Sequence, residues 1–154
     1  MDRHDLVDIF LERTYAPGFF AWVIPTGTDS VRVGLASRLP EVYSLLRHFI
    51  SHDRLVKDKL RNASIIKIFG GSVLTGGPIR KTFAERFLVV GDCAGQTKPT
   101  TGGGVVTGGI CARIASKVIV QSLLMDDFSE SFLERYEKMW RGELGHEFLL
   151  MLKL

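Results

Sequence analysis

One segment constrains the fold more than any other: an apolar strand that ends in Gly-Asp and leads through a loop into a glycine-opened helix. The segment spans residues 87–105 and reads FLVVGDCAGQTKPTTGGGV. Its first four residues are all apolar, which predicts a strand buried on both faces, as in a parallel sheet. A helix is expected over about residues 103–125. This order of elements is typical of α/β folds, in which ligands bind at the carboxyl ends of the strands.

The turn and the start of the helix carry groups suited to an extended cofactor. Gly91 lets the chain turn and approach a ligand closely, and the Asp92 carboxylate can accept hydrogen bonds from hydroxyl groups such as those of a ribityl chain. Pro99 stiffens the loop, and residues 102–104 are glycines, so a flat ring can reach the backbone. The free N–H groups of the first helical turn favour an anion or an electron-rich ring edge. Each feature alone is equally typical of an ordinary turn, but their order and spacing favour binding.

The first half of the chain predicts antiparallel sheet. Residues 19–25 alternate, with Phe20, Trp22 and Ile24 on one face, and residues 30–36 alternate likewise, so the two stretches predict a β-hairpin with one buried face. Further β-like stretches are residues 64–69 and 71–77. The pattern of residues 2–13 leaves helix and strand open.

Three stretches predict helices from their apolar period. They are residues 39–51, 52–62 and 128–153. In the last of them, Ser129 is expected to be the N-cap. Its apolar side comprises Phe132, Leu133, Tyr136, Met139 and Trp140.

Residues 91–105 resemble the second flavin motif of FAD-dependent hydroxylases and reductases, commonly GDAAG followed by P-x-x-G-x-G, with Cys93 where alanine is commoner. The nearest subgroup is the geranylgeranyl reductases, which include the archaeal digeranylgeranylglycerophospholipid reductases. Residues 15–25 resemble the aPGxYxWxFP segment of that subgroup's substrate-binding sheet. Residues 77–82 resemble the segment that leads into the Gly-Asp strand, and residues 136–140 resemble part of the C-terminal region. The likeness runs from about Thr14 to Trp140.

The resemblance implies the C-terminal part of a two-domain α/β FAD-binding fold of the hydroxylase/reductase type. In this stretch the fold has α+β character, with an antiparallel substrate-domain sheet, the final FAD-domain strand and helices. Residues 1–85 would form part of the substrate-binding sheet. Residues 86–125 would form the C-terminal FAD-binding segment, and residues 126–154 the C-terminal helix.

The resemblance also implies roles for individual residues, with FAD as the cofactor. Gly91 and Asp92 would bind the ribityl chain or the adjacent phosphate, and the backbone of Gly104 and Val105 would contact the pyrimidine edge of the ring. The approach to the ring would be shaped by Pro99, Gly102 and Gly103. Phe20 and Trp22 would face a long apolar substrate. No catalytic residue is identified.

The implied function is FAD-dependent reduction of isoprenoid carbon–carbon double bonds in lipid biosynthesis. Two alternatives stay open, namely a flavin monooxygenase or halogenase with the same motif, and a non-enzymatic lipid-binding or partner-binding remnant. The family begins with a βαβ unit that carries G-x-G-x-x-G, and this sequence has no match to it, since Thr107 stands where the third glycine would fall. We therefore expect a missing N-terminal FAD-binding half, and weak or no FAD binding by the chain alone.

The charge and the cysteine content limit the kinds of partner that can be expected. The net charge of +3 fits an anionic ligand or an anionic membrane surface, and no dense Lys/Arg run of the nucleic-acid-binding kind occurs. Cys93 and Cys111 match no zinc or redox motif, and His48 with His52 lacks a third ligand, so no metal is expected. Without an apolar leader or an uninterrupted apolar run of about 18 residues, we expect a cytoplasmic protein with peripheral membrane contact through an isoprenoid lipid substrate.

Overall fold

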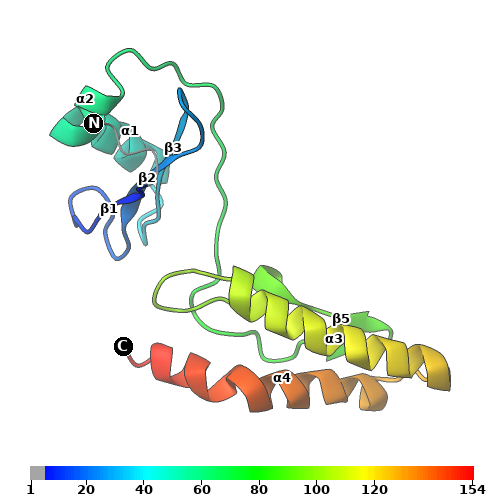
Figure 1. Cartoon of the computed structure of the whole chain (residues 1–154). Coiled ribbons are helices and arrows are strands. Elements are labelled where there is room, and N and C mark those ends of the chain that lie inside the picture. The colour runs from blue at the N-terminus through cyan, green and yellow to red at the C-terminus, as the bar shows by residue number, and fades with distance from the viewer. Residues whose placement is uncertain (1–5) are drawn as a thin grey trace. The chain divides into compact units, whose positions relative to one another are not determined.

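The structure, a computed structural model, describes residues 6–154. It contains two compact units that divide between Ile68 and Phe69 (Figure 1). This division differs from the functional boundary expected at residue 85, and the assignment of functions to residues 1–85, 86–125 and 126–154 stays a prediction. Of the ambiguous residues 2–13, the first four lie outside the described part of the chain, and strand β1 (Asp8–Phe10) lies within it.

The first unit is built on a three-stranded antiparallel sheet. Strands β2 (Ala21–Pro25) and β3 (Val31–Leu35) form the expected hairpin, and β1 pairs with the other edge of β2. The turn is closed by the backbone N–H of Thr26, which donates to the Ser30 carbonyl over 2.9 Å. The hairpin prediction is therefore confirmed. It was based on the alternation of apolar residues in both strands and on the polar residues between them.

The buried face of this sheet is not the face that carries Trp22. Ala21 and Val23 are fully buried, and they pack with Phe49 of helix α1 (Val42–His52) and Val56 of helix α2 (Arg54–Lys59). Trp22 lies on the opposite face and is only half-buried. The two expected helices are therefore confirmed with shorter bounds, and they cover the face of the sheet formed by smaller side chains.

The β-like stretches expected over residues 64–69 and 71–77 form no strand. A strand needs a neighbour for its backbone groups, and within residues 6–154 none pairs with this part of the chain. Ile65 and Ile66 consequently remain 72% and 88% exposed. The prediction of strands here was wrong for the described chain, although the residue types favour them.

The second unit packs two long helices against a small hairpin (Figure 1). Helices α3 (Val105–Met125) and α4 (Glu130–Met151) enclose a core that includes Cys111, Val118, Tyr136 and Trp140. The hairpin consists of β4 (Phe83–Ala84) and β5 (Phe87–Leu88). Both expected helices are confirmed.

Two details of the expected second unit are corrected. Phe87 is 60% exposed, so the strand thought to be buried on both faces is not, because β5 has β4 as its one neighbour among the described strands. Met139, expected on the apolar side of α4, is 44% exposed. The N-cap was expected correctly, since the Ser129 hydroxyl accepts a hydrogen bond from the Phe132 N–H over 3.2 Å.

Helix α3 is the one helix in the described chain that is long and apolar enough to cross a membrane. The relevant window has a mean hydropathy of 1.3, although 28% of it is buried inside the structure. Length and composition do not distinguish a membrane span from a core helix. The buried side of α3 packs on α4, as in a core helix.

Candidate cofactor site

The Gly-Asp turn is a single turn of 3-10 helix, η1 (Gly91–Ala94), which is separated from strand β5 by Val89 and Val90. Gly91 has φ 79° and Gly95 has φ 65°, both in the left-handed region that favours glycine. The N–H of Gly95 donates to the Asp92 carbonyl over 2.9 Å, and the N–H of Gln96 donates to the Gly91 carbonyl over 3.1 Å. The turn is thus held by its own backbone and leaves the Asp92 side chain exposed.

The Asp92 carboxylate lies against the start of α3. A Cβ added at Gly104 would come closer than 3.0 Å to Asp92 Oδ1 and would lie 3.0 Å from the Thr97 Cγ2 atom. Gly104 is also the N-cap of α3, and no side chain caps that end of the helix. Within residues 6–154 the Asp92 side chain has no recorded hydrogen bond or ion pair. A carboxylate acceptor and the N-terminal end of a helix therefore stand side by side.

The loop between η1 and α3 is ordered rather than merely glycine-rich. The Lys98 N–H donates to the Gly103 carbonyl over 3.0 Å, and the Gly102 N–H donates back to the Lys98 carbonyl over 2.8 Å. Gly102 has φ 70°, and Pro99 is buried. A Cβ at Gly103 would meet no atom closer than 3.4 Å. The loop is thus held by backbone hydrogen bonds between Lys98 and the glycines, while the space beside Gly103 is open.

A buried polar network stands behind the turn. The Gln96 side chain is fully buried. Its Oε1 accepts a hydrogen bond from the Gly91 N–H over 2.8 Å, and its Nε2 donates to the Tyr136 hydroxyl over 2.9 Å. Tyr136 in turn donates to the Val89 carbonyl over 3.0 Å, and burial raises its pKa to about 12. The Thr107 hydroxyl donates to the Gln96 carbonyl over 2.5 Å.

Our reading of the sequence missed Gln96, Thr107 and Tyr136 as parts of the site. The available signal was a glutamine in an apolar and glycine-rich loop, since buried amides require partners. The network joins the turn, α3 and α4, so the tertiary packing of the second unit positions the backbone of Gly91.

Within the second unit, the structure brings together several of the residues expected to bind a cofactor. Gly91, Asp92 and Gly104 gather where η1 meets α3, and a Cβ at Gly108 would lie 3.3 Å from the Gly91 Cα. Val105 is the first residue of α3 and is 92% exposed. Their assignment to FAD stays a prediction.

Phe20 and Trp22 belong to the first unit, where they form an aromatic pair. Their ring centroids lie 5.8 Å apart, and both side chains are half-buried. Ile9 pairs with Trp22 across the sheet and is 52% exposed. The outer face of the sheet is therefore apolar and accessible in the first unit. Substrate contact by Phe20 and Trp22 stays a prediction.

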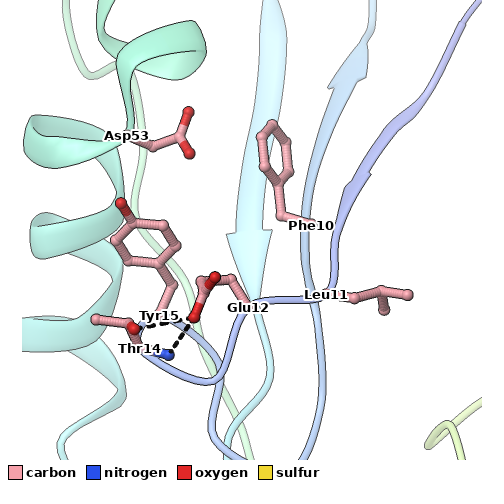
Figure 2. Close-up of a pocket in the computed structure, with 6 residues that line it drawn as sticks. All are labelled: Phe10, Leu11, Glu12, Thr14, Tyr15 and Asp53. Atoms are coloured by element: carbon pink, nitrogen blue, oxygen red, sulfur yellow. Dashed lines mark hydrogen bonds between the residues drawn. The ribbon is translucent and has the colours of Figure 1, made fainter.

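An open pocket of about 420 Å³ lies elsewhere in the first unit, and none of the expected site residues lines it. Figure 2 shows Phe10, Tyr15, Glu12 and Asp53 around it, with the Glu12 carboxylate turned back toward Thr14. Hydrogen bonds from the N–H and hydroxyl of Thr14, at 3.2 and 2.9 Å, hold the pKa of Glu12 below its usual value. The Asp53 carboxylate accepts from the Val56 N–H, so both acids already serve local structure.

Metal ligation finds no geometric support in the described part of the chain. No group of three or more His, Cys, Asp or Glu side chains is placed to hold an ion there. The rings of His48 and His52 stack with centroids 4.1 Å apart, and the His52 Nδ1 atom lies 2.8 Å from the Ser51 hydroxyl.

Comparison with known proteins shows which proteins this chain is similar to. No family model matches the sequence. An uncharacterized protein of Methanocaldococcus jannaschii is 42% identical over 143 residues, which cover 93% of this chain and 36% of that protein. The digeranylgeranylglycerophospholipid reductase of the same organism is 35% identical over 147 residues, which cover 95% of this chain and 37% of the reductase.

A solved structure has a similar fold. The crystal structure of a geranylgeranyl bacteriochlorophyll reductase-like protein from Thermoplasma acidophilum matches with a TM-score of 0.81 and 24% identity. The match covers 96% of this chain and 38% of that one. The chain therefore has the fold of part of a geranylgeranyl reductase-like protein.

The resemblance to geranylgeranyl reductases that was read from the sequence is confirmed, because most of the chain is similar to digeranylgeranylglycerophospholipid reductases. Among its relatives are digeranylgeranylglycerophospholipid reductases of archaea, at 33–38% identity over most of the chain. The chain spans between about a third and two fifths of the length of the curated relatives described above.

Proposed function

We propose that the chain supplies the ribityl and ring end of an FAD site in an enzyme that saturates isoprenoid carbon–carbon double bonds. The observation that carries the proposal is the contact between Asp92 and Gly104. It sets an exposed carboxylate beside the uncapped N-terminus of α3, at a position where a Cβ on residue 104 would collide with that carboxylate. The named activity of relatives such as the Methanopyrus kandleri digeranylgeranylglycerophospholipid reductase supports the same reaction class.

The residues present fit the flavin at this end. Asp92 would accept hydrogen bonds from ribityl hydroxyl groups. The first-turn N–H groups of α3, from Val105 onward, would donate toward the pyrimidine edge, where negative charge gathers on reduction. Gly102 and Gly103 leave the approach open, while Pro99 and the Gln96 network hold the backbone that binds. When bound, reduced FAD supplies the hydride that, with a proton, saturates the double bond.

The substrate is proposed to be an isoprenoid lipid that binds on the outer face of the first unit's sheet. Phe20, Trp22 and Ile9 present apolar side chains there that are at least partly exposed. Aromatic and aliphatic surface of this kind binds prenyl chains through burial of apolar area. A lipid substrate would bring the protein to a membrane surface, in keeping with the peripheral contact expected from the sequence.

The test is a chimera in which this chain is joined to the part of the Methanocaldococcus jannaschii reductase that lies outside its match. We expect the chimera to retain FAD, and the reduced form to saturate digeranylgeranylglycerophospholipid under anaerobic conditions, measured as added hydrogen by mass spectrometry. Asp92→Asn should lower FAD retention at least tenfold, because a hydrogen bond to a charged acceptor contributes about 1.5–3 kcal/mol.

The matched control is Asp29→Asn, which makes the same chemical change at an exposed residue of the β2–β3 turn. It should leave FAD retention unchanged. A chimera that folds without flavin would overturn the proposal. Oxygen consumption coupled to hydroxylation of the lipid would instead assign the site to a monooxygenase.

A further inference from the structure

Helix α3 carries two seams of apolar and small residues, and the core of the second unit fills one of them. The buried seam includes Thr107, Cys111, Ile114, Val118 and Ser122. A second seam, named here the outer seam, also advances in steps of three and four residues and consists of Gly109, Ala112, Ser116, Ile119 and Leu123. All five are exposed, with Ile119 at 44% and Leu123 at 61%. Val120 and Leu124, which lie beside the outer seam, are 54% and 82% exposed.

The outer seam is uncharged, and its one polar side chain already has a partner. The Ser116 hydroxyl donates to the Arg113 carbonyl over 2.9 Å. The neighbouring Arg113 side chain reaches α4, where it pairs with Glu143 over 2.8 Å. A Cβ added at Gly109 would meet no atom within 4 Å. A helix that is apolar on a second side as well as toward its own core is typical of a helix buried on both sides.

The spacing and the small residues select the kind of partner. Side chains in alternating steps of three and four residues form the line along which one helix packs on another. Because Gly109, Ala112 and Ser116 are small, they let a neighbouring helix approach closely, whereas a lipid surface gains little from burying so little apolar area. A second copy is disfavoured, since a symmetric pairing centred on Ser116 would bring the exposed Lys117 of each copy toward the other.

We propose that the outer seam packs against an apolar helix contributed by the part of a reductase-length polypeptide that lies outside these 154 residues. The solved structure matches 96% of this chain with 38% of its own, so a fold of this kind occurs within a much longer polypeptide. Helix α3 would then lie between α4 and the added helix. The proposal rests on the proposed function in one respect, because it takes the covering partner from a reductase.

The accessibility of a thiol placed in the outer seam tests the packing. Ser116→Cys is made together with Cys93→Ala, which leaves Cys111 buried in the core. Labelling of residue 116 by a maleimide, measured on its own peptide by mass spectrometry, should be roughly tenfold or more slower in the chimera described above than in the isolated chain, because a covered thiol does not react. Ser131→Cys, the same change at an exposed position of α4, is the control and should react at the same rate in both.

A larger side chain in the outer seam gives an independent test. Gly109→Leu should leave the urea midpoint of the isolated chain unchanged or raise it, because the space is open and leucine favours a helix more than glycine does. In the chimera it should lower the midpoint, because the contact with the added helix would be overpacked. Gly142→Leu is the matched control in α4, where a Cβ likewise meets no atom within 4 Å. It should lower neither midpoint.

Each result of the labelling has one interpretation. Fast labelling of residue 116 in a chimera that holds FAD overturns the packing while the proposed function stands, and slow labelling in a chimera without FAD does the reverse. Slow labelling already in the isolated chain overturns the proposal, in favour of a second copy if light scattering shows a dimer and of another part of the same chain if it shows a monomer. Labelling that phosphatidylglycerol vesicles slow, but the chimera does not, overturns it in favour of a lipid surface.

Discussion

The indole ring of Trp22 covers Gly34 on the neighbouring strand so closely that a Cβ at Gly34 would lie 2.5 Å from the indole Cζ2 atom. The two residues are directly paired in the β2–β3 register. Glycine is therefore required at this position for space, since its φ lies outside the left-handed region. The position of the aromatic surface on the outer face of the sheet depends on that missing side chain.

Gly34→Ala should therefore displace the Trp22 indole and destabilise the first unit. Overpacking of this kind costs about 1–3 kcal/mol, which urea denaturation followed by circular dichroism will measure. The double variant with Trp22→Ala should recover most of that loss, because the colliding ring is gone. Additive effects of the two substitutions would show that the ring does not occupy the space above Gly34.

Gln96→Leu should destabilise the second unit, because it leaves the half-buried Gly91 N–H without its acceptor. The Tyr136 hydroxyl loses the Gln96 amide and keeps its hydrogen bond to the Val89 carbonyl. Unsatisfied buried groups cost roughly 1–3 kcal/mol each. Faster hydrogen exchange at the Gly91 amide, along with a lower midpoint of urea unfolding, will report the loss. As a comparison, Tyr43→Phe removes a hydroxyl at a half-exposed residue of α1 and should leave stability nearly unchanged.

Glu137 should make the second unit more stable at neutral pH than in acid. Burial alone would raise the pKa of its carboxyl, but hydrogen bonds from Thr82 and Arg141 outweigh it and hold the pKa below the usual 4.5. A lowered pKa contributes stability that is present above the unfolded value and is lost as the pH falls through the folded value.

Glu137→Gln should therefore cost about 1–2 kcal/mol at pH 7, and the difference from the parent chain should shrink below pH 4.5. Urea titrations at several pH values will measure it. Glu134→Gln is the control, since Glu134 pairs with Lys138 on an exposed part of the same helix. A loss that is constant with pH would mean that the charge of Glu137 does not stabilise the fold.

The two cysteines should differ in reactivity toward a thiol reagent such as DTNB. Cys93 is exposed, whereas Cys111 is buried in the core beside α4, where burial raises the pKa of its thiol to about 11. Only the thiolate reacts, so one thiol should be titrated in the native chain and the second only in denaturant. Cys93→Ala should abolish the native-state reaction, and rapid reaction of that variant would show that the core opens readily.

Local patterns in the sequence were enough to predict those elements whose stabilising interactions are made by residues close in sequence. The hairpin of β2 and β3 carries its own turn and its own pairing partner, and α4 carries its own cap in Ser129. The turn that resembles a flavin motif was recognisable for the same reason, because Gly91, Asp92 and the following glycines are close in sequence. Which face of β2 is buried was a different matter, because Ala21 and Val23 depend on Phe49 for their cover.

By itself, the sequence determined the β2–β3 hairpin, the long helices α3 and α4 and the resemblance carried by the Gly-Asp turn, because these depend on residue type and short spacing. Only the tertiary structure decided that Gln96 and Tyr136 hold the turn from behind and that Asp92 rests on Gly104. It also showed that residues 64–68 lack a paired strand among those described. The physical reason is that a buried amide, a close packing contact and a strand each require a partner distant in sequence, which local pattern does not specify.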